Sequence, residues 1–300
     1  MTDESHELVD RPPMPERDPE GHKGTFGTVG VIGGQCGTEV MIGGPAFTAL
    51  AALHSGCGLA MLVAPRPVLP EILTVAPEAT GLPIEVREDG ALDASAAAET
   101  IDSGLARAGV IAIGPGFGEA EPQRQILLRL MAREHHPLVI DADALNLMAA
   151  TPDIQSDLRA PSVLTPHPGE FARIARTLGL DPEPKTTKQR MASARELAGR
   201  LGVIVVLKGA GTVVSDGLRV YVNSTGNSGL ATGGSGDVLT GLCAGFIAQF
   251  HPQLDLFGCA CMGVWVHGHA ADRIVAERGT PRLIARDLLS AIPDAIASYQ

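Results

Sequence analysis

The sequence has few aromatic residues, no excess of positive charge and no long apolar run. Aromatic residues make up 3% of the 300 positions, so the core has to be built from Ala, Val, Leu and Ile. A formal net charge of −11 excludes a general nucleic-acid surface, because such a surface needs a basic face. No apolar run reaches the ~18 residues of a membrane span. We expect neither nucleic acid nor membrane as a partner. An anionic ligand would have to be bound by glycine amides and a few cations at one site.

A cysteine framework and a leader segment are also missing. The five cysteines are odd in number, and their spacing fits neither a disulfide framework nor the usual pattern of metal ligands. The chain does not begin with a charged segment followed by an apolar stretch, as signal peptides do. These observations predict a cytoplasmic protein with no metal site of its own.

Apolar runs alternate with helix-compatible stretches from Gly24 onwards. Residues 28–34 and 59–65 are predicted strands on either side of a helix over 43–55, which is the βαβ pattern of a parallel sheet. Each later run ends in Gly, Pro, Asp, His or Lys. Because ligands bind at the carboxyl ends of parallel strands, these endings predict one sheet edge that binds a polar ligand. The later runs are residues 110–118, 137–146, 162–170 and 203–212.

The two ends of the chain differ in character. Residues 1–22 are acidic and Pro-rich, which predicts an arm that is not a packed element and that is either loosely held or wrapped around a neighbouring subunit. Residues 23–300 contain no linker and no internal repeat, so we expect a single domain. A hairpin is predicted to turn at Asp216-Gly217, and the tail beyond residue 254 is helical by composition.

The most unusual stretch is N-S-G-L-A-T-G-G-S-G-D-V-L-T-G-L at residues 227–242, which opens a helix-compatible segment. Glycines let the backbone approach a ligand closely, and the first amides of a helix suit a phosphate. Asp237 places a carboxylate at this point. Its spacing alone does not distinguish a helix cap from a catalytic base.

A lysine turn, Lys208-Gly209 followed by Gly211-Thr212, comes at the end of an apolar strand. Its ammonium and amides can meet a phosphate, although a solvated lysine in a plain turn would have the same sequence. Together with the glycine stretch, it predicts phosphates lying over the glycines and Asp237 facing the atom that gains or loses a phosphoryl group. In that arrangement Asp237 is better explained as a base than as a cap.

Two interpretations remain open for each of several other polar residues. His167 stands between two prolines and either contacts a ligand or makes a structural hydrogen bond. Asp141 and Asp143 close a strand and could hold a hydrated Mg²⁺ or ligand hydroxyls, or Asp143 could cap the next helix. His267 and His269 lie in an apolar helix, where a structural role is favoured.

The glycine stretch resembles the ribokinase-like superfamily. A wider set, in order along the chain from about His22 to the C-terminus, resembles the NAD(P)H-hydrate dehydratase family; it includes V-I-G-G, I-G-P-G-F-G, D-A-D-A-L-N, T-P-H-P-G-E, L-K-G-A-G-T and V-H-G-H-A-A-D. The resemblance implies a three-layer α/β/α fold with a central, mostly parallel sheet. It implies nucleotide-dependent dehydration of (6S)-NADHX and (6S)-NADPHX to NADH and NADPH, with Mg²⁺ as cofactor. ADP, giving AMP and phosphate, is the expected donor and ATP the alternative.

The resemblance also assigns roles to residues of this sequence. Asp237 would be the catalytic base. Two departures from the family pattern are Gly43-Gly44-Pro45, where small residues such as G-A-A are usual, and Ser224, where N-P-T-G is usual. The hydrate would be bound by Gly44, Gly116, His167 and Asp237, and the nucleotide by Lys208, Gly209, Ala210, Gly211, Thr212 and Gly236.

The resemblance implies partners as well. The chain has no room for the epimerase domain that many members carry, so we expect a stand-alone dehydratase that works with a separate NAD(P)H-hydrate epimerase and forms a homotetramer. Two other classes fit the glycine stretch, namely a small-alcohol kinase of the same fold and a nucleotide-binding module without turnover. The motifs T-P-H-P-G-E and I-G-P-G favour the lyase, and the intact Asp237 argues against an inactive module.

Overall fold

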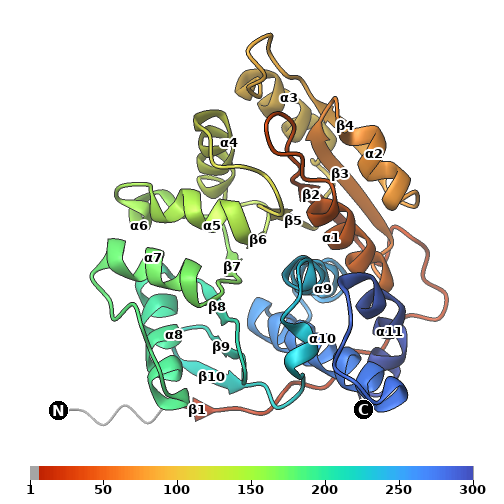
Figure 1. Cartoon of the computed structure of the whole chain (residues 1–300), viewed down its shortest axis with the longest axis vertical. Helices are drawn as coiled ribbons and strands as arrows, with labels where there is room; N and C mark the ends of the chain where they lie inside the picture. The colour runs from red at the N-terminus through yellow and green to blue at the C-terminus, as the bar shows by residue number, and fades with distance from the viewer. Residues whose placement is uncertain (1–6, 300) are drawn as a thin grey trace.

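A computed structural model describes residues 7–299 as a ten-stranded sheet with helices on both faces (Figure 1). The strand order is β1-β10-β9-β8-β7-β6-β5-β2-β3-β4. Neighbouring strands are parallel except for the two pairs that β9 makes, with β8 and with β10. The strands are β1 (Glu7–Leu8), β2 (Thr28–Ile32), β3 (Leu59–Pro65), β4 (Thr80–Ile84), β5 (Val110–Ile113), β6 (Leu138–Ile140), β7 (Ser162–Leu164), β8 (Ile204–Leu207), β9 (Val213–Ser215) and β10 (Arg219–Val222).

The central strands are buried on both faces, which is why their sequences are continuously apolar. In β5, Val110 and Ala112 belong to the core on one face of the sheet, whereas Ile111 and Ile113 belong to the core on the other. Successive side chains of a strand point to opposite faces, so one short apolar run contributes to two cores.

The helices form one layer on each face, and the predicted three-layer α/β/α arrangement is confirmed. Figure 1 shows α1, α2, α9, α10 and α11 on one side of the sheet and α3 to α8 on the other. Among the described residues, no helix is long and apolar enough to cross a membrane. The helices are α1 (Gly43–His54), α2 (Leu69–Val75), α3 (Ala94–Gly104), α4 (Glu121–Met131), α5 (Ala142–Ala149), α6 (Ile154–Asp157), α7 (Pro168–Leu178), α8 (Thr187–Leu201), α9 (Ser235–Phe250), α10 (Leu256–Arg278) and α11 (Ala285–Ala297), with a short 3₁₀ turn η1 (Ser228–Leu230).

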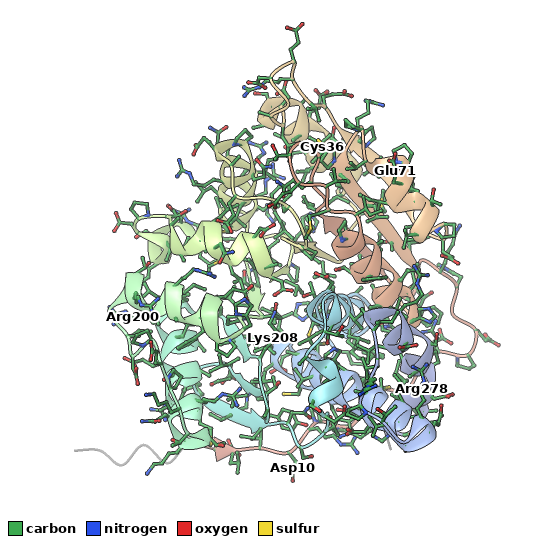
Figure 2. The ribbon with its side chains drawn as sticks, in the orientation of Figure 1. Asp10, Cys36, Glu71, Arg200, Lys208 and Arg278 are labelled. Atoms are coloured by element: carbon green, nitrogen blue, oxygen red, sulfur yellow. The ribbon has the colours of Figure 1, made fainter. Side chains whose placement is uncertain are left out.

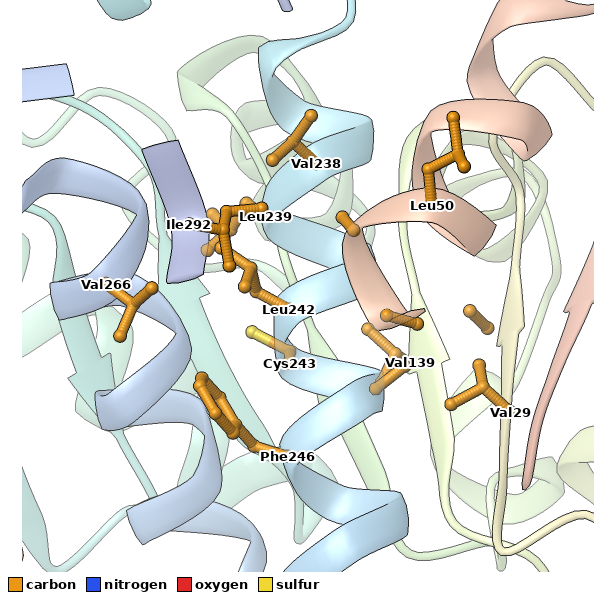
Figure 3. Packing of buried hydrophobic residues seen from close by; sticks show 14 of the residues in the cluster. Val29, Leu50, Val139, Val238, Leu239, Leu242, Cys243, Phe246, Val266 and Ile292 are labelled. Atoms are coloured by element: carbon orange, nitrogen blue, oxygen red, sulfur yellow. The ribbon is translucent and has the colours of Figure 1, made fainter. Parts of the chain in front are cut away.

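Helix α9 lies between α1 and α10, and small residues let it come close to α1. A Cβ atom added at Gly241 would lie 2.2 Å from the carbonyl oxygen of Thr48 in α1, a distance that no side chain allows. On α9, Leu242, Cys243 and Phe246 pack in the same apolar cluster as residues of α1, α10 and α11 (Figure 3). This packing holds the first turn of α9, which carries Asp237, in a fixed position.

The predicted hairpin is confirmed as β9 and β10, which pair antiparallel. Gly217 has a φ of +94° at the turn, and the side chain of Asp216 accepts hydrogen bonds from the amides of Leu218 (2.9 Å) and Arg219 (2.6 Å). Gly and Asp therefore serve the turn in the way their positions in the sequence predict.

The N-terminal arm packs against the rest of the chain, so the expectation that it is not a packed element is wrong for its described part. Strand β1 adds to the sheet beside β10. The guanidinium of Arg11 lies 4.5 Å from the ring centre of Trp265 and 4.2 Å from that of Tyr299, and the Tyr299 hydroxyl donates to the carbonyl of Pro12 at 2.9 Å. Cation–π contacts hold a segment whose acidic, Pro-rich composition predicts no packing. Residues 1–6 of the predicted arm lie outside the described residues.

Candidate active site

A cavity of about 780 Å³ lies at the carboxyl ends of β7 and β8, where the first residues of α9 and part of α10 complete its wall. Its position is the one at which open parallel sheets bind ligands, and its volume suits a molecule of nucleotide size. Glycine, serine, threonine and asparagine predominate in the lining, which offers backbone amides and hydroxyls. The lining includes His167, residues 208–212, residues 223–228, Thr232, Ser235, Gly236 and His267.

Helix α9 begins at this cavity without a side-chain cap. Its N-cap residue is Gly234, with a φ of +85°, and no side chain accepts a hydrogen bond from the first amides of the helix. Asp237 lies in the first helical turn but does not cap it. The cap interpretation of Asp237 is therefore wrong. The Ser235 amide donates to the Thr232 carbonyl at 3.3 Å, whereas the Gly236 amide has no acceptor within residues 7–299 and can meet an anion.

A buried ion pair stands beside the start of α9. The Lys208 ammonium lies 2.7 Å from Oδ1 of Asp141 and 3.8 Å from Oε2 of Glu170, and Lys208 occupies the middle of the molecule in Figure 2. The other oxygen of Asp141, which is 1% exposed, accepts a hydrogen bond from the Thr240 hydroxyl at 2.7 Å. A Cβ added at Gly236 would lie 3.4 Å from Lys208 Nζ, an ordinary contact distance, so Gly236 lies directly beside the ammonium.

Two carboxyl groups near this ion pair have raised pKa values. Desolvation by burial, helped by the charge of Asp141 and opposed by that of Lys208, raises the pKa of Asp237 to about 7. Desolvation also raises the pKa of Glu170 to about 7. Burial lowers the pKa of Lys208, but the carboxylates of Asp141 and Glu170 outweigh burial and raise it overall. A carboxyl group that titrates near neutral pH beside a fixed cation is suited to general-base work.

His167 begins α7, and hydrogen bonds fix its ring. Its Nδ1 accepts from the amides of Gly169 (2.9 Å) and Glu170 (3.3 Å), and Glu170 accepts from the His167 amide at 2.7 Å. Because Nδ1 is an acceptor, the hydrogen bonds assign the proton of the neutral ring to Nε2, which lies 3.3 Å from Glu170 Oε1. The structural interpretation of His167 is confirmed; its contact with a ligand stays a prediction.

The lysine turn, residues 208–212, lines the cavity as expected. Gly209 and Gly211 have φ values of +145° and +61°, which residues with a side chain adopt only with strain. The Thr212 hydroxyl closes the turn by donating to the Gly209 carbonyl at 3.0 Å. The turn therefore needs both glycines for its shape.

Gly44 and Gly116 do not line the cavity; both are buried where α1 packs on the turn after β5. A Cβ added at Gly44 would lie 3.0 Å from the carbonyl carbon of Pro115, so α1 packs tightly on the turn that contains Gly116. The Thr48 hydroxyl is 3.0 Å from the Gly44 carbonyl and 3.1 Å from the Asp237 carbonyl. Through Thr48, the predicted hydrate-binding residues of α1 adjoin the predicted base.

Asp141 and Asp143 each bond to other groups of the protein, and the interpretation in which they hold a hydrated Mg²⁺ stays a prediction. Asp141 is occupied by Lys208 and Thr240, and Asp143 accepts from the Gly118 amide at 2.7 Å. Asp143 does not cap α5. The N-cap residue of this helix is Asp141, and its side chain makes no capping hydrogen bond to the first amides of α5. Within residues 7–299, no group of three His, Cys, Asp or Glu side chains could hold a metal ion.

Side chains of α10 bond to the start of α9 and to the loop before η1. His267 Nε2 lies 2.9 Å from the Ser235 carbonyl, and burial lowers the pKa of His267 to about 4, so its neutral ring donates to that carbonyl. His269 stacks on Trp265 with ring centres 4.5 Å apart, so a structural role is confirmed for both histidines. Asp272, which closes the V-H-G-H-A-A-D motif but was not predicted as a site residue, accepts from the Gly226 amide at 2.8 Å.

Three further residues of the site were not predicted from the sequence. Glu170 closes the T-P-H-P-G-E motif, so its place beside His167 could have been found there. Thr240 and Arg190 have no local sequence signal, because they act on residues far away in the chain. Thr240 bonds to Asp141, and Arg190 donates to the carbonyls of the lysine turn.

Comparison with known proteins identifies the family. A family profile described as NAD(P)H-hydrate dehydratase matches residues 29–294. The chain belongs to the NAD(P)H-hydrate dehydratase family. A bifunctional NAD(P)H-hydrate repair enzyme from Moorella thermoacetica is 37% identical over 293 residues, which cover 97% of this chain and 53% of the relative. The corresponding Escherichia coli enzyme is 36% identical over 279 residues, 92% of this chain and 48% of the relative. The chain thus spans about half the length of these relatives.

Solved structures agree with this family assignment. The ADP/ATP-dependent NAD(P)H-hydrate dehydratase of Bacillus subtilis, co-crystallised with ATP and Mg²⁺, superposes with a TM-score of 0.75 at 30% identity and covers 96% of this chain and 95% of its own. A ribokinase of Cryptococcus neoformans superposes with a TM-score of 0.53 over 89% of this chain and 99% of its own; at 15% identity this shows a shared fold alone. The predicted family resemblance and the ribokinase-like α/β fold are confirmed.

Proposed function

We propose that this chain catalyses the nucleotide-dependent dehydration of (6S)-NADHX and (6S)-NADPHX to NADH and NADPH, with ADP as the preferred donor and ATP as the alternative. One observation carries the proposal beyond family membership. Asp237 lies in the uncapped first turn of α9 with a pKa raised to about 7, next to Lys208 and a nucleotide-sized cavity. A carboxylate in that position can receive a hydroxyl proton at neutral pH.

In this proposal the nucleotide lies in the cavity. Its phosphates contact the amides of the lysine turn and of Gly236, and the Lys208 ammonium faces them from the wall. The hydrated nicotinamide lies beside the nucleotide, and the family resemblance assigns its contacts to Gly44, Gly116 and His167. In this proposal Asp237 stands between the two substrates, which is supported by the Thr48 hydroxyl that bonds to the carbonyls of both Asp237 and Gly44 and by its neighbour Gly236 in the cavity lining.

The reaction then proceeds in two stages. The Asp237 carboxylate takes the proton of the hydrate hydroxyl while that oxygen attacks the terminal phosphorus, and the bond between this phosphorus and the bridging oxygen breaks to release AMP from ADP. The carbon–oxygen bond of the phosphorylated hydrate next breaks as the neighbouring carbon loses a proton. The products are the reduced nicotinamide and phosphate. Lys208 and the amides stabilise the charge on the transferred group.

Magnesium fits this site as an ion held by the nucleotide. Mg²⁺ commonly binds through phosphates and water with few protein carboxylates, which agrees with the lack of a three-ligand group within residues 7–299. When bound, it would neutralise phosphate charge. The Bacillus subtilis relative was co-crystallised with ATP and Mg²⁺.

The expected partners are part of the proposal. An NAD(P)H-hydrate epimerase would supply the (6S) epimer; this is consistent with the relatives, which are named bifunctional and of whose length the chain spans about half. A homotetramer is proposed from the family resemblance, and light scattering of the purified protein tests it. A cytoplasmic location is supported by the five cysteines, which are all free.

The decisive test is an assay of purified protein with NADHX and Mg²⁺, with ADP and ATP in parallel reactions. Recovery of the near-ultraviolet absorbance of NADH, with release of phosphate, is expected, and the faster reaction identifies the donor. Accumulation of a stable phosphorylated alcohol would instead indicate a kinase. A protein that binds nucleotide but turns over neither donor would refute the proposed function.

A further inference from the structure

One guanidinium group, that of Arg190, binds the backbone carbonyls of the lysine turn. Arg190 Nη1 donates to the carbonyl of Ala210 and, at 3.1 Å, to that of Gly211. Its Nη2 donates to the carbonyls of Leu207 at 3.0 Å and Lys208 at 3.3 Å. A single side chain thus bonds four carbonyls around one turn, and its planar fork of donors suits that task.

The direction of these carbonyls determines the direction of the amides. In a trans peptide, the carbonyl of one residue and the amide of the next point in opposite directions. The amides that follow the bonded carbonyls of the turn belong to Gly209, Gly211 and Thr212 and point away from Arg190, and all three residues line the cavity. In the described part of the chain, none of these three amides donates to a protein acceptor. Three unused donors on one turn form an anion-binding concavity.

The charge of Arg190 is not neutralised by an acid. Among residues 7–299, no carboxylate pairs with it, and desolvation by burial lowers its pKa. The four carbonyls accept the hydrogen bonds of Arg190 but do not cancel its net positive charge, which remains next to the turn. That charge adds to the attraction of the three amides for a phosphate.

The position of Arg190 on α8 explains how it reaches the turn. Arg190 lies on the same helical face as the buried residues Ala194, Leu197 and Leu201, which face the sheet. The helix begins just before it, where the Thr186 hydroxyl accepts from the Gln189 amide at 3.2 Å as part of a capping box. The side chain of Arg190 therefore extends along the sheet to the end of β8.

We propose that Arg190 is a positioning residue for the nucleotide. It holds the lysine turn in the shape in which the amides of Gly209, Gly211 and Thr212 bind the phosphates of ADP or ATP. The inference rests on the proposed function, since it assumes that the cavity binds this nucleotide. It adds a residue with no expected ligand contact, in a helix that carries none of the predicted site residues.

The test compares Arg190→Gln and Arg190→Lys with the wild type and with Arg200→Gln. Arg200 is an exposed residue in the last turn of the same helix and lies at the outer edge of the molecule in Figure 2, so it controls for loss of a positive charge on α8. Calorimetry with ADP and with ATP gives the dissociation constants, and steady-state kinetics give KM for nucleotide and for NADHX separately. Thermal unfolding monitors the fold of each variant.

We expect Arg190→Gln to raise the nucleotide dissociation constant and KM at least tenfold while KM for NADHX changes less than twofold. Arg190→Lys keeps the charge but cannot bridge four carbonyls, so its effect should be intermediate, and Arg200→Gln should match the wild type. Should Arg190→Gln fail to fold, the lysine variant alone decides the question. Nucleotide constants within twofold of wild type in the folded Arg190 variants would overturn the inference and leave the proposed function intact. Absence of nucleotide binding in the wild type would refute the proposed function itself.

Discussion

The carboxyl edge of the sheet has two parts with different chemistry. Where β2 and β5 end, the turns are made of glycine and proline, and positive φ values occur at Gly34 (+87°), Gly114 (+121°) and Gly116 (+57°). Where β6 and β8 end, the edge carries the buried pair of Asp141 and Lys208. We call these parts the glycine side and the charged side.

The two parts differ in what they offer to the two substrates of the proposed function. On the glycine side, the missing side chains allow close packing within the protein: an added Cβ would lie 1.8 Å from the Asp141 carbonyl oxygen at Gly114 and 2.8 Å from the Met41 Cβ at Gly116. On the charged side, burial raises the pKa of Asp237 and of Glu170, and in the proposed function the Lys208 ammonium faces a phosphate. Asp237 lies between them, with α1 on one side and Lys208 on the other. Substitutions on the two sides should therefore alter different kinetic constants.

The largest effect is expected at the junction of the two sides. Asp237→Asn should lower kcat by about 10²–10⁴-fold, because the amide cannot accept the hydroxyl proton, and should leave nucleotide affinity unchanged. Asp294→Asn, an exposed aspartate on α11, is the matched control for the isosteric change. Steady-state kinetics and calorimetry measure the two quantities. A variant that keeps more than about a tenth of the rate would rule out the base role.

On the charged side, Asp141→Asn removes the partner of the Lys208 ammonium. Breaking a buried pair in this way typically costs about 3–5 kcal/mol, and we expect both a lower free energy of unfolding and a loss of kcat/KM of about a hundredfold. The double variant Asp141→Asn/Lys208→Met should recover stability without recovering activity. Denaturant unfolding and kinetics check both statements. Recovery of activity in the double variant would show that this ion pair is only structural.

The pH dependence of kcat/KM reports the protonation of the base. Because the pKa of Asp237 is raised to about 7, the base is protonated below this value and active above it. Activity should rise as pH increases through about 7 and be roughly tenfold lower one pH unit below the inflection. The charge of Glu170 contributes to the raised pKa, so Glu170→Gln should move the inflection to lower pH. A profile that is flat between pH 5 and 8 would contradict this assignment.

On the glycine side, Gly116→Ala should raise KM for NADHX and leave nucleotide affinity unchanged. The residue has a φ of +57°, and an added Cβ would lie 2.8 Å from the Cβ of Met41. A cost of about 1 kcal/mol corresponds to roughly a fivefold change. Gly279→Ala is the control, since Gly279 has a similar φ of +69° with nothing within 4 Å of an added Cβ. If both variants behave alike kinetically, Gly116 has no specific part in hydrate binding.

The smallest expected effect concerns stability. The pKa of Glu170 is about 7 in the folded protein against an ordinary value of 4.5, so the folded state binds a proton more tightly than the unfolded state. The contribution to stability is complete below pH 4.5 and is lost as pH rises through about 7. Glu170→Gln should flatten the dependence of the melting temperature on pH in this window by a few degrees. An unchanged slope would show that Glu170 does not titrate there.

Several site residues were predictable because their signal is local. The glycines of the lysine turn and of the stretch before α9 stand next to the residues they serve, and the polar endings of the apolar runs identify the sheet edge. The N-terminal arm shows the opposite case. Its composition predicts no packing, but Arg11 meets Trp265 and Tyr299, which are more than 250 positions away, and no local pattern can show such a contact.

By itself, the sequence determined the α/β class, the polar residues at the strand ends and the prediction that Asp237 is the base. These inferences rest on apolar periodicity and glycine spacing, which depend only on neighbours in the chain. Only the tertiary structure decided the pKa of Asp237 and the shape of the lysine turn. Asp237 has a pKa near 7 because folding buries it beside Asp141, and the lysine turn has its shape because folding brings Arg190 to its carbonyls. Burial and charge proximity are properties of distance in space. Residues far apart along the chain acquire them only when the sheet assembles.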